Sequence, residues 1–215
     1  MTKQLLIGDN INMTFEQLKQ ISPDANLGTW HQHPNGGGWV ENTARVHDTA
    51  YVGKNAQVFG NAQVYNNAKV FENAQVFGNA QVCDNAEVFG DAEVSGDAKV
   101  SGDAEVCGDA RVYGTAWVLD NAEVYGNAQV YDNAEVSGDA KVYDTAWVSG
   151  DAEVYDNAQV YGNAWVSENG RVGEDAEVYD NVRVFGHAHV YGNAKMYGNV
   201  KMCNYDWENQ GDEIS

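Results

Sequence analysis

Basic residues are scarce in this chain. Lysine and arginine together number 12, against 32 aspartates and glutamates, and the formal net charge is -20 over 215 residues. A charge of this size keeps a protein soluble and repels nucleic acid and anionic membranes, so we expect neither as a direct ligand. The sequence also lacks any apolar run that approaches the roughly 18 residues of a membrane span.

Signals for export and for disulfide bonds are missing as well. Only residues 5–7 are apolar behind the first few residues, which is too short for the core of a signal peptide. Cys83, Cys107 and Cys203 fall in three different columns of the repeat described below, so we expect no intramolecular disulfide. Both absences favour a reducing, cytoplasmic location.

Helical periodicity is absent from most of the chain, and a six-residue period takes its place. From Val40 to Val190, 26 valines lie six residues apart, and Met196 and Met202 extend the series. An alanine stands two residues before nearly every one of them. Six-residue spacing does not build an amphipathic helix. In a strand, however, Ala-x-Val places both apolar side chains on one face.

The units are separated by turn pairs, usually Gly-Asn, Gly-Asp or Asp-Asn. These residues adopt left-handed backbone conformations at low cost, so each pair ends one short strand and turns the chain into the next. A chain of short strands and corners winds into a coil whose interior is valine and alanine. The exact period therefore predicts an all-β repeat architecture over residues 40–202.

This unit resembles that of the hexapeptide-repeat proteins, in which an aliphatic and a small residue recur at fixed places. The resemblance covers roughly residues 38–203. It implies a single-stranded, triangular parallel β-helix, left-handed, with about 18 residues in each coil. About nine such coils, at ~4.8 Å per coil, form a rod about 43 Å long. The Gly-Gly-Trp-Val sequence that leads into the first coil is similar to that of uncharacterised bacterial and phage members of this group.

The two ends do not carry the repeat. Residues 1–39 predict an N-terminal cap with a short helix, because Thr14 and Gln17 have the spacing of a capping box and Pro23 would end the helix. Such a cap is expected, since the first coil of a solenoid exposes apolar surface and strand edges. Residues 203–215, which include Tyr205 and Trp207, predict a polar C-terminal cap or tail.

The resemblance also raises the possibility of an enzyme. Many hexapeptide-repeat proteins are acyltransferases that act as trimers, with a histidine as general base and coenzyme A bound between neighbouring rods. In this chain no loop interrupts the repeat between Val40 and Met202, and the five histidines have no recognisable nucleophile beside them. We therefore expect no catalysis, no cofactor and no metal site; the regularly spaced aspartates lie on different edges of the rod.

Acidic residues are concentrated in the middle of the rod. Residues 84–180 contain 22 acids and four bases, a net charge of -18. Stacking of one coil on the next places eleven of these acids along one corner and on the strand that follows it. The predicted acidic residues are Asp84, Glu87, Asp103, Glu105, Asp120, Glu123, Asp139, Asp156, Glu174, Asp175 and Glu177. The same face carries a predicted column of tyrosines, Tyr125, Tyr143, Tyr161 and Tyr179.

These residues are the predicted partner-binding site. Like charges stacked ~4.8 Å apart are unfavourable, and asparagine would serve the same turns, so the acids favour a recognition role. The expected function is non-catalytic binding to a basic protein surface. The partner that fits best is a nucleic-acid-binding protein, whose binding site the rod would occupy as a mimic of nucleic acid. A phage inhibitor of a host defence protein would be one example of such a decoy. The alternatives are a structural scaffold or polymer subunit, which includes homo-oligomers formed through a flat face, and an acyltransferase.

Overall fold

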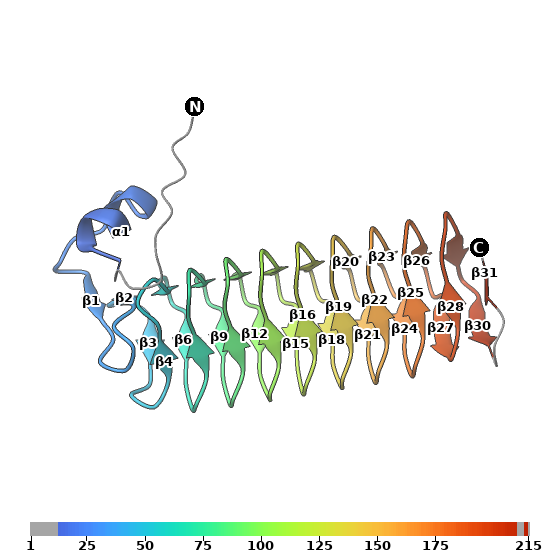
Figure 1. The fold of residues 1–215 in the computed structure, drawn as a ribbon, viewed down its shortest axis with the longest axis horizontal. Coiled ribbons are helices and arrows are strands. Elements are labelled where there is room, and N and C mark those ends of the chain that lie inside the picture. Colours follow the sequence, from blue (N-terminus) through green and yellow to red (C-terminus); the bar gives the residue numbers. More distant parts are fainter. Residues whose placement is uncertain (1–12, 210–212, 215) are drawn as a thin grey trace.

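The computed structural model describes residues 13–209 and 213–214. These residues form a straight rod of short parallel strands, with one short helix at the N-terminal end (Figure 1). Three sheets run along the rod and make its three sides. The expected all-β parallel β-helix of about nine coils, with a small helical cap, is confirmed.

The strands of the described residues belong in turn to three sheets, which we name A, B and C. Sheet A contains β1 (Trp30–Gln32), β2 (Trp39–Glu41), β5 (Gln57–Val58), β8 (Gln75–Val76), β11 (Glu93–Val94), β14 (Arg111–Val112), β17 (Gln129–Val130), β20 (Trp147–Val148), β23 (Trp165–Val166), β26 (Arg183–Phe185) and β29 (Lys201–Cys203). Sheet B contains β3 (Arg45–Val46), β6 (Gln63–Val64), β9 (Gln81–Val82), β12 (Lys99–Val100), β15 (Trp117–Val118), β18 (Glu135–Val136), β21 (Glu153–Val154), β24 (Arg171–Val172), β27 (His189–Gly192) and β30 (Asp206–Asn209). Sheet C contains β4 (Tyr51–Val52), β7 (Lys69–Val70), β10 (Glu87–Val88), β13 (Glu105–Val106), β16 (Glu123–Val124), β19 (Lys141–Val142), β22 (Gln159–Val160), β25 (Glu177–Val178), β28 (Lys195–Met196) and β31 (Glu213–Ile214).

Each strand of the repeat pairs with the third strand before it and the third strand after it. In sheet C, Glu87 lies opposite Glu105 and Val88 opposite Val106, so one coil consists of three of the six-residue units. The backbone closes the ladder, for example through the Glu87 amide, which donates to the Ala104 carbonyl oxygen at 2.9 Å. Since neighbouring strands lie ~4.8 Å apart, each outward side chain contacts the equivalent side chains one coil before and one coil after it.

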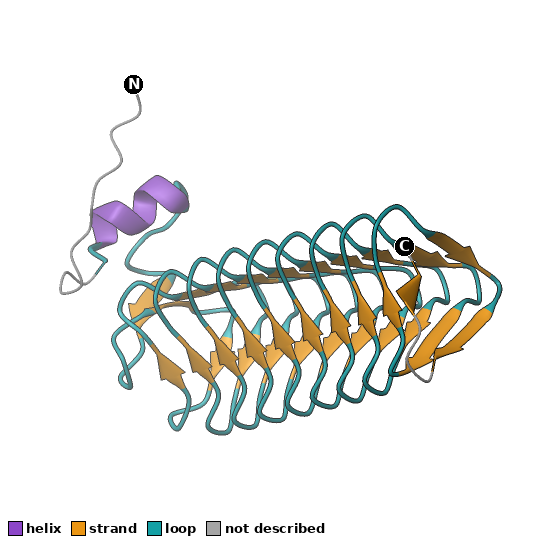
Figure 2. Ribbon diagram, turned by 45° about the vertical axis from the view of Figure 1, so that its right-hand side comes forward, coloured by secondary structure: helices purple, strands orange, loops and turns teal. Residues whose placement is uncertain are grey.

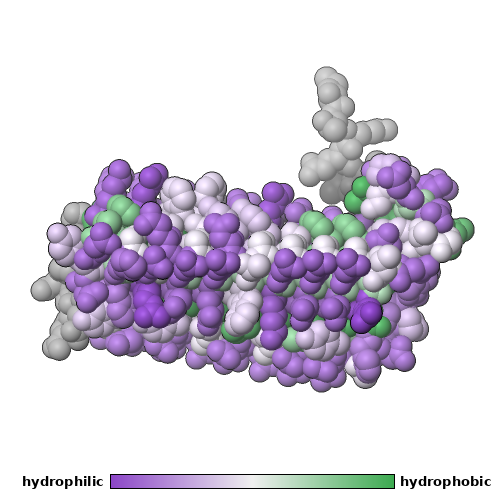
Figure 3. Space-filling model, turned by 180° about the vertical axis from the view of Figure 1, so that it is seen from behind, coloured by the Kyte–Doolittle hydropathy of each residue, from purple (hydrophilic) through white to green (hydrophobic). Residues whose placement is uncertain are grey.

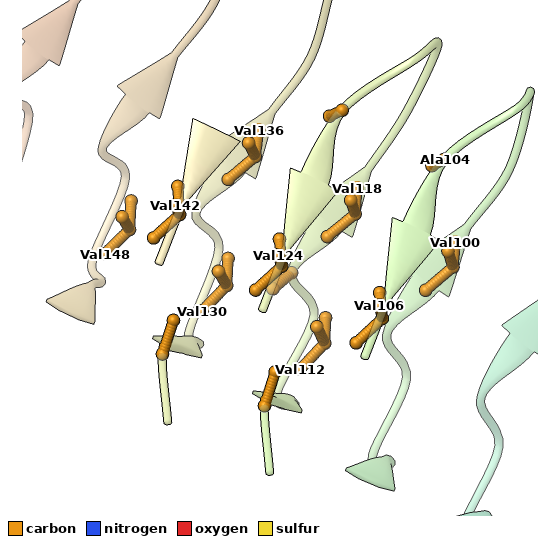
Figure 4. Close-up of a cluster of buried hydrophobic side chains, with 14 of the residues drawn as sticks. Val100, Ala104, Val106, Val112, Val118, Val124, Val130, Val136, Val142 and Val148 are labelled. Carbon is orange, nitrogen blue, oxygen red and sulfur yellow. The ribbon is translucent and has the colours of Figure 1, made fainter. Parts of the chain in front are cut away.

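Valine and alanine fill the interior as the repeat predicts. From Val52 to Val160 every valine of the six-residue series is fully buried, as is the alanine two residues before it. Figure 4 shows the valines of successive coils projecting inward in parallel rows. The branched valine suits an extended backbone, and the small alanine lets the wall approach closely at the corner. Burial is thus set by the period of two within each strand.

The corners are tight turns with a left-handed first residue. In these turns the residue after the valine accepts a hydrogen bond from the next alanine, as between the Cys83 carbonyl oxygen and the Ala86 amide at 3.2 Å. The residue between them that begins the turn has a positive φ, 64° at Asp84 and 79° at Gly102. A Cβ on Gly102 would lie 2.6 Å from the backbone oxygen of Asp120, so this corner needs glycine. Figure 2 shows the corners of successive coils in register.

The N-terminal end is covered by the segment before the repeat. Helix α1 (Phe15–Ile21) begins with the expected capping box, in which the side chains of Thr14 and Gln17 each accept from the other's backbone amide. Phe15 packs on Trp39 with ring centroids 5.6 Å apart, and the Trp39 indole donates to the Met13 carbonyl oxygen. β1 pairs antiparallel with β2, which covers one strand edge of the first coil.

The C-terminal residues that the structure describes continue the rod. β30 pairs in parallel with β27, and β31 pairs with β28. Tyr205 is exposed between β29 and β30. The strands of the tail therefore prolong sheets B and C and place their backbone groups against the last full coil. Among the described residues, no helix has the length and apolarity required to cross a membrane.

An aspartate in the interior should prevent folding. Val124 is fully buried, so Val124→Asp buries an unpaired charge and should lower the free energy of unfolding by more than about 4 kcal/mol. Asn163→Asp adds the same charge at an exposed corner whose neighbours one coil away, Thr145 and Asn181, are uncharged, and should change it by less than about 0.5 kcal/mol. Urea unfolding followed by circular dichroism measures both; equal losses would contradict the interior assigned to Val124.

Candidate binding surface

The corner between sheets B and C carries the predicted corner acids. We name it the acidic corner; it consists of Asp84, Asp103, Asp120, Asp139, Asp156, Glu174 and Asp175. All seven residues are exposed, and each follows a strand of sheet B and precedes a strand of sheet C. The register thus brings them together along one edge of the rod, with an acid in every coil from Asp84 to Asp175. Figure 3 shows hydrophilic side chains in rows that run lengthwise along the rod.

The acids of this corner alternate between its two positions. At the first position, Asp84 stacks on Gly102, which stacks on Asp120; at the second, Asp103 stacks on Asn121. Carboxylates in one column are therefore mostly separated by two coils, about 9.6 Å, rather than by one. Asp156 and Glu174 are the exception, since they occupy the first position in consecutive coils. The continuous stack of like charges expected from the sequence is thus largely avoided.

Hydrogen bonds between coils hold the corner carboxylates. The Nδ2 atoms of Asn85, Asn121 and Asn157 donate to the Oδ1 atoms of Asp103, Asp139 and Asp175, at 2.8, 2.8 and 2.9 Å. Amide ladders between two asparagines elsewhere are longer, 3.2 Å from Asn61 to Asn79. A hydrogen bond from an amide to a charged carboxylate is stronger than one between two neutral amides. The alternation of asparagine with aspartate therefore holds the side chains of this corner in place.

Carboxylates at the first corner position accept from the backbone of the next coil. Asp84 Oδ2 accepts from the Gly102 amide at 3.4 Å, and Asp120 Oδ2 accepts from the Gly138 amide at 3.1 Å. Asp84 Oδ1 also accepts from Asn66 Nδ2 at 2.8 Å. The bond from Asn66, and then the one from Gly102, lowers the pKa of Asp84. These carboxylates therefore satisfy the turn as well as charging the surface.

The outward residues of sheet C form a second column beside the acidic corner, which we name the sheet C column. Lysines missed by the sequence analysis interrupt it: Lys69 lies 2.6 Å from Glu87, Lys141 lies 2.8 Å from Glu123, and Lys195 lies 2.9 Å from Glu177. Among the described residues Glu105 has no such ion pair. Much of the charge of this column is therefore compensated. The spacing of one coil between each lysine and its glutamate could have revealed the pairs.

The tyrosines lie on the other side of the sheet C column. The tyrosine ladder, as we name it, consists of Tyr125, Tyr143, Tyr161 and Tyr179, and its rings stack at 4.9, 4.8 and 4.8 Å between centroids, with interplanar angles of 3°, 5° and 4°. The Tyr143 hydroxyl donates to Gln159 Oε1 at 3.3 Å, and the Tyr161 hydroxyl donates to Glu177 Oε2 at 3.2 Å. The predicted column is thus present, half-buried and bonded to the sheet C column.

The histidines lie near the two ends of the rod in the part of the chain that the structure describes, where His31 and His47 line one hollow and His187 and His189 another. His31 and His47 contact Asn42 and Thr49 near the N-terminal end, whereas His189 Nε2 lies 2.6 Å from the Tyr155 hydroxyl near the other end. His33 is buried, and its Nε2 atom has no hydrogen-bond partner in the described residues. Within the same part of the chain, no three histidine, cysteine or acidic side chains are arranged to hold a metal ion.

Ionisation of the tyrosine ladder should destabilise the rod. Burial, with Tyr125 and Asp144 nearby, raises the pKa of Tyr143 from 10.0 to about 12, and burial also raises the pKa values of Tyr125 and Tyr161. The folded state thus holds these tyrosines neutral, and the stability that this gives is present below pH ~10 and lost as pH rises through the folded pKa values. We expect tyrosinate absorbance to rise at higher pH in the folded protein than in urea, with a smaller difference in Tyr143→Phe. Coincident titrations would contradict the expectation.

Comparison with known protein families identifies one similar segment. A family model described as the YdcK β-solenoid repeat matches residues 158–174. No curated protein matches the chain. The matched segment contains β22, β23 and β24, one strand of each sheet, and so corresponds to about one coil. The similarity agrees with the architecture observed over the whole rod: the chain is a parallel β-solenoid repeat protein.

Proposed function

We propose that this β-solenoid acts by binding rather than by catalysis, and that its ligand is a basic protein surface. The binding surface would consist of the acidic corner, the sheet C column and the tyrosine ladder. One observation carries the proposal: an exposed carboxylate occurs in every coil from Asp84 to Asp175 along a single edge. An edge of this kind attracts basic partners and speeds their association.

The density of charge favours a partner that otherwise binds nucleic acid. Residues 84–180 carry a net charge of -18. At ~4.8 Å per coil they span about 26 Å, so the axial density is about one charge per 1.4 Å. Duplex DNA carries about one charge per 1.7 Å. A rod with this density can occupy a nucleic-acid site as a decoy, which is also the logic of a phage inhibitor of host proteins.

Rigidity supports the same proposal. The bonds from Asn85, Asn121 and Asn157 hold the second-position carboxylates in place before a partner arrives, so binding orders few side chains. The lysines of the sheet C column neutralise three glutamates, so on this side of the rod the charge is concentrated at the acidic corner. The half-buried faces of the tyrosine ladder offer apolar contact area beside that charge.

Two further observations support a non-catalytic, cytoplasmic protein. His31 and His47 lie near one end of the rod and His189 near the other, with partners that are parts of the turns and strands. Cys83, Cys107 and Cys203 are free, as a reducing compartment requires. The proposal predicts no turnover of acyl-coenzyme A.

Charge removal at the acidic corner tests the proposal. The test variant changes three residues to Asn: Asp103, Asp139 and Asp175. Each new side chain keeps an oxygen that can accept from the asparagine one coil before it, so the turns should be preserved. The triple variant should capture less basic protein from a lysate, and the protein captured by the wild type should be released by added duplex DNA and by salt.

The control removes equal charge elsewhere. Asp97, Asp109 and Asp151 occupy the same turn position at the other two corners and are equally exposed. Their change to Asn should leave capture close to wild type. Equal capture by the two triple variants, or capture that DNA does not displace, would contradict the decoy. Histidine-dependent turnover of acyl-coenzyme A would contradict the non-catalytic role.

A further inference from the structure

A second exposed column near the C-terminal end of sheet A combines aromatic and basic side chains. β20, β23, β26 and β29 stack Trp147 on Trp165, Trp165 on Arg183, and Arg183 on Lys201. The Trp147 side chain is 40% exposed, although an indole ring is costly to leave in water. The two indole rings meet edge to face at 5.7 Å, and the Arg183 guanidinium lies 5.1 Å from the centre of the Trp165 ring.

The two cations of this column have no counter-ion among the described residues. Five other cations of the rod, Lys69, Arg111, Lys141, Arg171 and Lys195, each pair with a glutamate one coil away, whereas Arg45, Lys54 and Lys99 form no salt bridge within the described residues. Arg183 and Lys201 instead lie opposite each other in the register, and neither forms a salt bridge within the described part of the chain. Like charges placed opposite each other on neighbouring strands are unfavourable. In a chain of net charge -20, this pair is a local concentration of positive charge that can bind an anionic group.

A hollow lies beside this column because two serines replace aromatic residues. The residue after the valine in sheet A is Tyr131 in one coil and Phe185 three coils later, but Ser149 and Ser167 in the coils between. The cavity left there has a volume of about 410 Å³ and is lined by Trp165, Arg183, Lys201, both serines, Phe185, Asp132, Gly150 and Glu168. Ser149 Oγ accepts from the Trp165 indole at 3.2 Å.

Two carboxylates complete the lining. Asp132 Oδ2 accepts from the Gly150 amide at 3.3 Å, and Glu168 Oε2 accepts from the Gly186 amide at 3.0 Å. Each carboxylate has a second oxygen that can accept from a ligand hydroxyl. The same carboxylates disfavour a ligand as highly charged as a polyphosphate. The hollow therefore combines an indole face, hydroxyl groups, hydroxyl acceptors and one pair of cations.

We propose that this hollow binds an acidic saccharide, with a sugar ring against Trp165 and the sugar carboxylate against Arg183 and Lys201. Ser149, Ser167, Asp132 and Glu168 bind its hydroxyl groups. The four residues of the column span three coil steps, about 14 Å, which suits a short oligosaccharide. This site is on sheet A and is independent of the acidic corner. It follows the general pattern of a concave, partly aromatic pocket with few convergent polar groups.

The test fills the hollow without disturbing the fold. Ser167→Tyr introduces a tyrosine at a position where other coils already have Tyr131 and Phe185, so the coil should accept the larger side chain without unfolding. Ser137→Tyr makes the same change on the sheet B side of the rod, far from the hollow, and is the control. Calorimetry with a hexuronate oligosaccharide, and with the neutral oligosaccharide of the same linkage, measures binding.

We expect the hexuronate to bind the wild type and Ser137→Tyr with equal affinity. Its affinity for the wild type should be at least tenfold higher than that of the neutral oligosaccharide, and at least tenfold higher than its own affinity for Ser167→Tyr. Combined Arg183→Gln and Lys201→Gln should remove the preference for the acidic sugar, whereas combined Arg45→Gln and Lys99→Gln, which removes equal charge elsewhere, should keep it. Equal binding of acidic and neutral sugars, unchanged binding in Ser167→Tyr, or binding of inorganic phosphate or nucleotide but not hexuronate would overturn the proposal.

Discussion

The stacking of each coil directly on the one before it decides what every outward side chain of this rod contacts. Backbone hydrogen bonds such as that from Glu87 to Ala104 fix this register, and the neighbours of a surface residue are consequently the equivalent residues one coil before and one coil after it. In the interior, identical residues stack well, because valine on valine excludes water. On the surface, identical charges would repel, so the outward columns need an order of their own.

That order is visible at the acidic corner and in part of the sheet C column. The sheet C column places lysines next to glutamates, and the acidic corner alternates aspartate with glycine or asparagine. Carboxylates do stack in consecutive coils at Glu87, Glu105 and Glu123, and there lysines one coil away pair with the two outer glutamates. The acids therefore serve the turns and the surface field together, and the field is organised rather than a uniform coat of charge. Arg183 and Lys201 lie opposite each other beside a hollow in sheet A, and it is the hollow together with the two cations that indicates a ligand.

Most of the fold could be predicted from the sequence, because one six-residue period fixes strand, corner and interior at once. The capping box at Thr14 was likewise readable, since it depends on residues three apart. The columns of Asp84 and Tyr143 followed from the spacing of one coil, which is three of these units. The ion pairs of Lys69, Lys141 and Lys195 share that spacing of one coil and could have been predicted in the same way. The bonds from backbone amides to Asp84 and Asp120 depend on the left-handed turn geometry and could not be read from residue types.

The sequence thus has two periods. The six-residue unit determines the interior, and the full coil of three units determines the surface. A pair of deletions tests the two periods separately. Removal of residues 158–175 takes out one coil, joins Asn157 to Ala176, and keeps every column aligned. Removal of residues 158–163 joins Asn157 to Ala164, which keeps the interior valine phase but moves all later outward residues onto the sheet that precedes their own in chain order. Thermal unfolding followed by circular dichroism should show two cooperative β proteins, with the shorter deletion melting several degrees lower because its ion pairs, amide ladders and ring stacks are mismatched. Failure of the shorter deletion to fold, or equal melting temperatures, would contradict the separation of interior and surface.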